Sequence, residues 1–404
     1  MAGRVPVLSP IREALRTEAG GGVLLLAATV AALAWANSAW ADSYQNFWHT
    51  NLSIGPGSWA VREDLQHWVN DALMVVFFFL IGLEIKRELV VGELRDPRAA
   101  ALPVLAALGG MVVPAVLFLA LAGGGEAGRG WAIPMATDIA FVVGILALLG
   151  SRVPARLKVF LLTLAIVDDI GAIVVIAAFY SSGLSGLWLA GAIAALAAVV
   201  VVRRLGLARP MAYLPIGVVA WYCTYRAGIH PTIAGVALGL LTPARPVGGR
   251  EVLEDLEHRL HPWSSYLVVP MFALANAGVP LGSGALGTAA GSRLTWAVVL
   301  GLVAGKILGI TAVAWGATRA GAGRLPPGVR MNNVLGASAL GGIGFTVSLF
   351  ITGLAFTSEE LQMQAKIGIL AGSLIAAIVG VAILLRRSEP AEDVAVSTDE
   401  RAAV

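Results

Sequence analysis

The chain has 404 residues, of which 58% are hydrophobic and 13% are charged, about half the charged share of an ordinary soluble domain. This composition excludes a soluble globular protein, whose surface needs more charge, and a disordered chain, which would be polar. A single cysteine excludes a disulfide-rich scaffold, and a net charge of +3 does not indicate a nucleic-acid partner, so the remaining class is a polytopic membrane protein.

Twelve stretches are long and apolar enough to cross a bilayer as helices, which takes about 20 residues each. They are apolar on all sides, and such long runs do not fit the alternating strands of a membrane β-barrel. The sequence therefore predicts an all-α fold with twelve transmembrane helices, at residues 18–40, 66–86, 99–122, 130–150, 157–181, 184–202, 210–226, 228–243, 262–280, 295–318, 331–356 and 362–385.

The first predicted span can also be interpreted as a cleaved signal peptide. Its apolar stretch at 23–36 follows a basic segment, and Ala-Trp-Ala occurs at 34–36 and 39–41. We favour a retained span, because removing it would disturb the regular distribution of basic loops described next.

Basic residues alternate along the loops. Arg4, Arg12 and Arg16 precede the first span, and most of the 28 Lys and Arg residues lie there, in the even-numbered loops or after the last span. The odd-numbered loops carry only Arg62, Arg129, Arg226 and Arg293. Because basic loops stay in the cytoplasm, both termini are expected to be cytoplasmic. The polar, acidic residues 387–404 are expected to form a disordered tail after a single transmembrane domain, 1–386.

The fourth predicted span contains polar residues in its middle. Pro134 disrupts helical hydrogen bonding there, and Thr137 and Asp138 follow it. A charge at mid-bilayer costs about 2.5–3.5 kcal/mol on insertion scales, so Asp138 is expected to be paired or to face a wet cavity.

Two adjacent carboxylates, Asp168 and Asp169, lie in the fifth span. Neighbouring helix positions differ by about 100° in direction, so one can face an ion-accessible cavity while the other faces a partner such as Lys306, the base within the tenth span. Carboxylate oxygens suit a hard cation, and a site that holds either protons or a cation has the minimum chemistry of an exchanger.

The eleventh span also shows a break, because Gly341, Gly342 and Gly344 disfavour a continuous helix. Spans four and eleven are each second in a group of three, spans 3–5 and 10–12. Two interrupted helices at corresponding positions indicate inverted repeats around a transporter binding site. Asp138 is expected to compensate the positive helix ends there, and Lys306 the negative ends.

Together these motifs resemble the NhaA family of bacterial Na+/H+ antiporters, over about residues 12 to 385. The residues that carry the resemblance are Gly82-Leu-Glu-Ile-Lys-Arg-Glu-Leu89, Ala136-Thr-Asp-Ile-Ala140, Val167-Asp-Asp-Ile-Gly171, Leu256-Glu-His-Arg-Leu-His-Pro-Trp263 and Gly305-Lys-Ile-Leu-Gly309.

The resemblance implies a role for each matching residue. Asp168 and Asp169 match the pair that binds Na+ and protons, Thr137 and Asp138 the interrupted fourth helix, and Lys306 the lysine of the tenth helix. It also implies a short extracytoplasmic β-hairpin near 45–58 that serves dimerisation. Residues linked to the pH response are Glu84, Arg87, Glu88, His230, Glu257, His258 and His261.

Simpler interpretations exist for part of this set. Glu84, Arg87 and Glu88 have the spacing of ion pairs at a helix end, and His258 and His261 are also typical of an interfacial helix. Pro231 biases His230 away from helical backbone. His49 and His67 belong to no recognisable group of residues.

The resulting hypothesis is a pH-activated, electrogenic sodium/proton antiporter of the bacterial inner membrane, without a cofactor and not an enzyme. It would exchange Na+, and Li+ as well, for protons, as a homodimer in the lipid bilayer. A passive cation channel is the main alternative. An intramembrane aspartyl protease is less consistent, because its Gly-x-Gly-Asp motif is absent, and a prenyltransferase would need a further spaced acid after Asp169.

Overall fold

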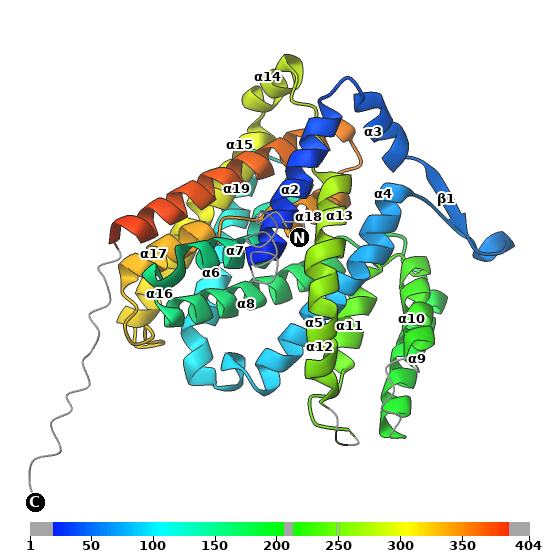
Figure 1. The fold of residues 1–404 in the computed structure, drawn as a ribbon, viewed down its shortest axis with the longest axis horizontal. Helices are drawn as coiled ribbons and strands as arrows, with labels where there is room; N and C mark the ends of the chain where they lie inside the picture. The colour runs from blue at the N-terminus through cyan, green and yellow to red at the C-terminus, as the bar shows by residue number, and fades with distance from the viewer. Residues whose placement is uncertain (1–18, 206–212, 248, 250, 388–404) are drawn as a thin grey trace, which may run out of the picture.

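The computed structural model describes residues 19–205, 213–247, 249 and 251–387. These residues form a mostly helical molecule with one small β-hairpin in its described part (Figure 1). The basic segment that contains Arg4, Arg12 and Arg16, and the predicted tail beyond residue 387, lie outside the described residues.

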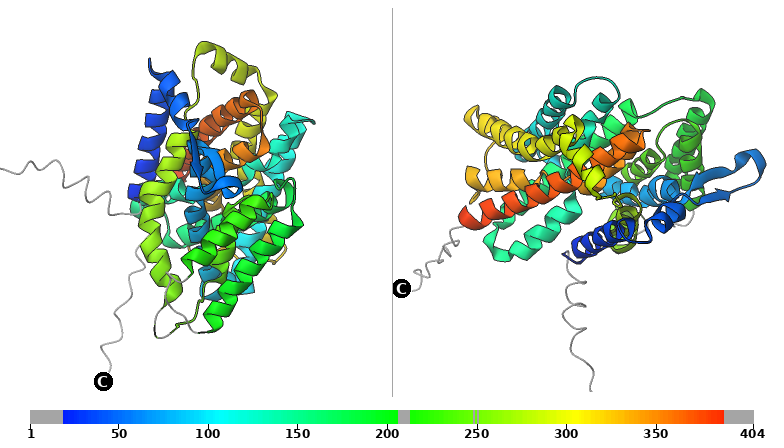
Figure 2. Two further views of the ribbon diagram at one scale, coloured as in Figure 1. Left: turned by 90° about the vertical axis from the view of Figure 1, so that its right-hand side faces the viewer. Right: turned by 90° about the horizontal axis from the view of Figure 1, so that it is seen from above.

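The described part of the chain starts with an apolar helix, followed by a hairpin that projects from the bundle (Figures 1 and 2). Helix α2 (Ala19–Ala36) turns by 114° into α3 (Ala41–Trp48), and β1 (Asn51–Ile54) pairs antiparallel with β2 (Val61–Asp64) around the short turn η1 (Gly57–Trp59). The hairpin thus lies further along the chain than the expected range 45–58. Residues 45–48 are helical instead, because Tyr44 and Trp48, one helical turn apart, are buried on the same face of α3.

The next elements include most of the long apolar helices. Short 3-10 and π turns carry the label η. In chain order the elements are α4 (Leu65–Trp68), η2 (Val69–Leu73), α5 (Met74–Val90), η3 (Glu93–Arg95), α6 (Pro97–Ala122), η4 (Ala127–Met135), α7 (Ile139–Leu149), η5 (Gly150–Arg152), α8 (Ala155–Phe179), α9 (Gly186–Arg204), α10 (Leu214–Arg226) and α11 (Thr232–Leu241).

The C-terminal part supplies the remaining helices, of which α17 contacts α8 (Figure 1). Its elements are α12 (Val252–Trp263), η7 (Ser264–Val268), α13 (Val269–Asn276), α14 (Ser283–Gly291), α15 (Arg293–Leu300), η8 (Gly301–Gly305), α16 (Lys306–Arg319), α17 (Met331–Leu340), α18 (Phe345–Ala355) and α19 (Glu359–Arg387).

The helices confirm an all-α membrane protein but not the number of spans. Every one of the twelve predicted ranges contains helix, whereas only seven helices in the described part are long and apolar enough to cross a membrane, or up to nine if each bent pair is one span. The difference arises where helices are short, as in α11 with 10 residues, or carry several charges, as in α12. Twelve spans therefore stay a prediction.

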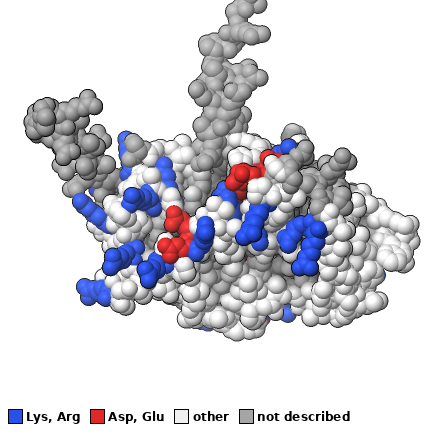
Figure 3. All heavy atoms as spheres, turned by 90° about the horizontal axis from the view of Figure 1, so that it is seen from below, with Lys and Arg blue, Asp and Glu red and all other residues white. Residues whose placement is uncertain are grey.

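Charge and shape distinguish the two ends of the molecule. Figure 3 shows the lower end, where basic side chains surround a few acidic ones over the described surface. The hairpin and α14 lie at the opposite, upper end, and α9 and α10 stand beside each other at one side (Figure 1).

Candidate functional site

Two helical stretches lose their helical backbone in the middle of the molecule. The 3-10 helix η4 ends at Met135, Ala136 and Asp138 are extended (φ −83°, ψ 152° and φ −83°, ψ 100°), and α7 begins at Ile139. On the other side, α17 ends at Leu340 and α18 begins at Phe345, with a bend of 48°. The breaks occur where the sequence predicts them, although Pro134 lies inside η4 and the chain becomes extended only after Met135.

The two breaks contact each other. The backbone N–H of Asp138 donates to the carbonyl oxygen of Ile343 at 2.6 Å, and the Thr137 hydroxyl lies 2.9 Å from the carbonyl oxygen of Gly341. The second break also packs closely against η8, because a Cβ at residue 342 would overlap the Leu302 carbonyl oxygen. Backbone groups that lose their helical partners are thus satisfied by the other break, as a low-dielectric interior demands.

Asp138 is positioned between two helix N-termini. Its Oδ1 accepts from the backbone N–H of Phe141 at 3.1 Å, and its Oδ2 accepts from the backbone N–H and the hydroxyl of Thr346 at 2.9 and 2.5 Å. The carboxylate is 2% exposed. A carboxylate compensates the positive end of a helix, and here one carboxylate serves the first turns of both α7 and α18.

Asp168 forms a buried ion pair. Its Oδ2 lies 2.5 Å from Lys306 Nζ and 2.7 Å from Thr137 Oγ1, and Lys306 Nζ lies 3.1 Å from Thr137 Oγ1. Asp168 and Lys306 are both 0% exposed. Lys306 therefore contacts a carboxylate and a hydroxyl, and its link to the helix ends runs through Thr137, whose hydroxyl faces the Gly341 carbonyl.

Asp169 points to a different environment from Asp168. It is buried, and no described residue forms a hydrogen bond or an ion pair with its carboxylate. Its electrostatic surroundings include Glu84 of α5 as well as Asp168, Asp138 and Lys306. The pair thus does not form a two-carboxylate clamp on one side of α8, as the angle between neighbouring helix positions predicts.

Close helix packing determines where Lys306 lies. It follows the π-helical turn η8, a type of distortion that is frequent at functional sites. Gly305 and Gly309 pack against α6 so closely that a Cβ at residue 309 would overlap the carbonyl oxygen of Gly109. The small residues at these positions allow α16 and α6 to approach and enclose the lysine.

Within the group formed by Asp168, Lys306 and Thr137, one carboxylate oxygen is unpaired. Asp168 Oδ1 is buried and has no hydrogen-bond partner among the described residues. A buried acceptor without a partner is costly, so this oxygen is suited to take a proton or a hard cation. The Thr137 hydroxyl lies beside the same carboxylate, 2.7 Å from Asp168 Oδ2.

The predicted pH-response residues are brought together only in part. Arg87 Nη1 lies 2.5 Å from Glu257 Oε1, and Arg87 Nη2 lies 3.8 Å from the Glu88 carboxylate. The ion pair of Arg87 with Glu257 thus joins α5 to α12, whereas an ion pair between Glu84 and Arg87 within α5 is not among the contacts of the described residues. His258 and His261 are exposed on α12, and the His258 ring contacts the Glu254 carbonyl of its own helix.

His230 lies far from that cluster. It is non-helical, as Pro231 predicts, and its Nε2 lies 3.2 Å from Asp71 Oδ1. Its ring meets the Phe350 ring of α18 edge-on, with centroids 4.8 Å apart. The sequence interpretation missed Asp71 as the partner, because the two residues lie far apart in the sequence.

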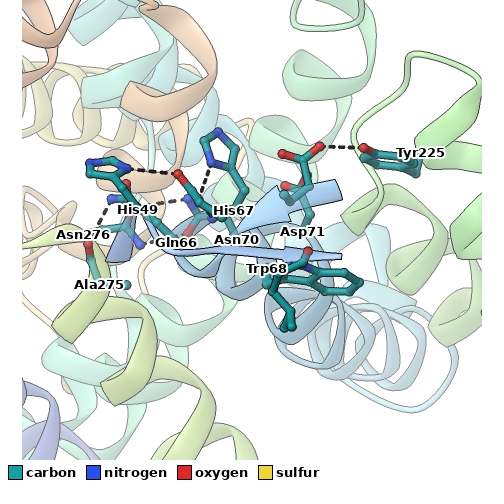
Figure 4. A network of polar contacts seen from close by, with 12 residues as sticks. His49, Gln66, His67, Trp68, Asn70, Asp71, Tyr225, Ala275 and Asn276 are labelled. Carbon is teal, nitrogen blue, oxygen red and sulfur yellow. Dashed lines mark hydrogen bonds and ion pairs between the residues drawn. The ribbon is translucent and has the colours of Figure 1, made fainter. Parts of the chain in front are cut away.

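His49 and His67 do form a group, contrary to the sequence interpretation. Both imidazoles contact the Asp64 carboxylate at the base of the hairpin, at 3.0 and 2.7 Å (Figure 4). Burial raises the pKa of Asp64, but hydrogen bonds from the two histidines and the His67 backbone outweigh it, so the pKa lies below its ordinary value. Beside them, Gln66 donates to the Ala275 carbonyl, which joins α4 to α13 (Figure 4).

Comparison with known proteins gives one consistent result. Residues 12–384 match the family described as Na+/H+ antiporter 1. The Na(+)/H(+) antiporter NhaA 3 of Frankia alni is 48% identical, over 94% of this chain and 89% of the relative. The Na(+)/H(+) antiporter NhaA 2 of Sorangium cellulosum is 45% identical over 98% and 94%, and the Na(+)/H(+) antiporter NhaA of an Acidovorax species is 49% identical over 94% and 95%.

Proposed function

This chain belongs to the Na+/H+ antiporter 1 family, and on this basis we propose that it exports Na+ across the bacterial cytoplasmic membrane in exchange for protons, with Asp168 and Asp169 as the ion-binding residues. As a family member it is a multi-pass membrane transporter and not an enzyme. The observation that carries the assignment of the site is the unpaired, buried Asp168 oxygen beside two crossing helix breaks.

The proposed cycle is alternating access. Facing the cytoplasm, Na+ displaces protons from the two carboxylates, the loaded site reorients, and Na+ leaves on the outside before protons bind again. With two protons for each Na+, one net charge moves inward per cycle, which draws about 2.3 kcal/mol per 100 mV from the membrane potential. An inside-negative potential then drives Na+ out.

Two carriers account for the second proton. In the first, both carboxylates bind protons when Na+ leaves. In the second, Lys306 binds the proton, because Na+ at Asp168 displaces the ammonium that contacts the same carboxylate. The Lys306→Gln variant separates the two. If Lys306 is the carrier, this variant exchanges one proton fewer per cycle, and its exchange no longer responds to the membrane potential.

The finer architecture is proposed with the function. We propose twelve spans, inverted repeats in spans 3–5 and 10–12, one transporter domain at 1–386 with a tail at 387–404, and cytoplasmic termini. The basic lower end of the molecule supports this orientation (Figure 3). A homodimer through the hairpin is supported by the exposed strand β1, where Leu52 and Ile54 are 41% and 53% exposed.

Activation by pH and transport of Li+ complete the proposal. The residues proposed for the pH response are Glu84, Arg87, Glu88, His230, Glu257, His258 and His261, and the link between Arg87 and Glu257 across α5 and α12 supports a joint role for the first helix pair.

Proton flux in everted membrane vesicles tests the function. Na+, Li+ or K+ is added to respiring vesicles across a pH series, and proton release after Na+ is expected. Asp168→Asn and Asp169→Asn are each expected to abolish it, and robust exchange in either variant would overturn the assignment. Sodium flux without coupled proton movement would favour the alternative, a passive cation channel.

A further inference from the structure

The contacts around the crossing leave the role of Thr346 unexplained. This residue is 2% exposed and lies in the first turn of α18. Its hydroxyl and its backbone N–H both donate to the same oxygen, Asp138 Oδ2. Thr346 thus belongs to the crossing but does not touch the Asp168–Lys306 pair.

Its hydrogen bonding differs from that of Thr352 and Ser338, although Ser348 of α18 likewise donates outside its own helix, to the Ile133 carbonyl oxygen. Buried Ser and Thr side chains within helices ordinarily donate to the carbonyl four residues earlier. Thr352, also on α18, does so with Ser348, and Ser338 on α17 does so with Val334. Thr346 instead directs its hydroxyl to another segment of the chain.

Helix α18 depends on that segment for its N-terminal cap. The residue at its N-cap is Gly344, which has no side chain to accept from the first backbone N–H groups. Asp138 supplies the acceptor from the extended segment 136–138. The hydroxyl of Thr346 adds a second, charge-assisted hydrogen bond to the same carboxylate oxygen, a class of bond stronger than neutral ones.

The extended backbone carries this constraint to the ion-binding residues. Successive side chains of an extended segment point to opposite sides. Asp138 accordingly faces α18, whereas Thr137 faces Asp168, Lys306 and the Gly341 carbonyl. Fixing the Asp138 carboxylate therefore also fixes the place of the Thr137 hydroxyl.

We propose that Thr346 is a positioning residue of the transport site: through Asp138 it holds the extended segment 136–138, and so sets the affinity of the Thr137–Asp168 site for Na+. This inference rests on the proposed antiport function. It predicts that loss of the hydroxyl weakens Na+ binding while leaving the protein folded and able to turn over.

The test compares three purified variants in proteoliposomes. Thr346→Val removes the hydroxyl at nearly constant volume, Thr346→Ser keeps it, and Thr352→Val removes an equally buried hydroxyl from the same helix that bonds only within α18. The Na+ concentration for half-maximal exchange (KM) and the maximum rate are measured for each, together with the apparent unfolding temperature in detergent.

For Thr346→Val we expect the KM for Na+ to rise about tenfold, which corresponds to about 1.4 kcal/mol, with the maximum rate preserved within about twofold. Thr346→Ser and Thr352→Val are expected to keep the wild-type KM. If Thr346→Val cannot be recovered from the membrane, Thr346→Ala takes its place with the same expected rise.

Three results would overturn the proposal: equal KM values for the Thr346→Val and Thr352→Val variants, a Thr346→Ser variant as impaired as Thr346→Val, or a loss of maximum rate at constant KM, which indicates only less folded protein. Wild-type vesicles that show no Na+-dependent proton flux would instead overturn the proposed function, so the two failures are distinguishable.

Discussion

The buried pair of Asp168 and Lys306 makes the sharpest stability prediction. Both side chains are fully buried, and Lys306 Nζ has two partners, Asp168 Oδ2 and Thr137 Oγ1. Lys306→Met leaves a buried carboxylate without its cation, and Asp168→Asn leaves a buried ammonium without its anion. Removing one partner of a buried ion pair costs about 3–5 kcal/mol.

The double variant, Asp168→Asn with Lys306→Met, removes both charges together. The amide that the first substitution introduces still has the Thr137 hydroxyl beside it, so we expect the double variant to lose about 1–3 kcal/mol, well below the sum of the single losses. The two single losses sum to about 6–10 kcal/mol, so the coupling energy is at least about 3 kcal/mol, at or above the upper end for residues in one network. The two variants that carry Asp168→Asn are expected to lose exchange.

Unfolding free energies come from SDS titration in mixed micelles, followed by far-UV circular dichroism. Thr352→Val, which leaves the pair untouched, is the control for a general loss of packing in the core. Additive losses, with the double variant as unstable as the sum of the single ones, would refute the ion pair and with it the close approach of α8 and α16 at this level.

Three further predictions concern packing, charge and pH. Gly309→Ala is expected to destabilise the protein by about 1–3 kcal/mol, because the added Cβ would meet a backbone oxygen of α6. The control Gly316→Ala, on the same helix with open space around it, is expected to be neutral, and thermal unfolding compares the two variants. Arg87→Gln is expected to change stability by less than about 1 kcal/mol, because the guanidinium is 42% exposed, yet to move the pH of half-maximal exchange by releasing Glu257; an unchanged pH profile in vesicles would contradict this. Because the pKa of Asp64 is lowered in the folded protein, its ionised carboxylate stabilises the fold at pH values above 3.8, the ordinary pKa of an Asp, and this stabilisation is lost as the pH falls through the folded-state pKa. Asp64→Asn is therefore expected to lower the unfolding temperature at pH 7 and to match the wild type in strong acid.

The polar centre could be predicted from sequence because charges are rare inside apolar helices. Asp138, Asp168, Asp169 and Lys306 stand out by the cost of placing a charge in a bilayer, and the structure brings Lys306 to Asp168. The helix break at 341–344 was also evident, since three glycines occur in four positions.

Contacts between distant polar residues could not be predicted in this way. Thr346 lies 208 positions after Asp138, and a threonine in a membrane helix ordinarily bonds to its own helix, so its sequence position carries no signal. His49 meets Asp64 across 15 positions because the end of α3 lies beside the base of the hairpin, whereas the His67–Asp64 contact spans three positions and its spacing could have indicated it. The range of the hairpin, expected near 45–58, was placed too early, since the helical segment before it is fixed by burial of Tyr44 and Trp48.

In both halves of the proposed site, the backbone conformation separates the directions of two adjacent polar side chains. In the extended segment, neighbouring residues point to opposite sides, so Thr137 joins the ion-binding residues and Asp138 joins the helix ends. On α8, neighbouring residues differ by about 100°, so Asp168 meets Lys306 and Asp169 does not. On the proposed function, Asp168 is the carboxylate at which a cation and the ammonium would compete, whereas Asp169 offers a buried carboxyl group without a fixed partner among the described residues. On the proposed function, that asymmetry links the arrival of Na+ to the release of a positive charge from the site, which is the coupling that an exchanger needs and a channel lacks.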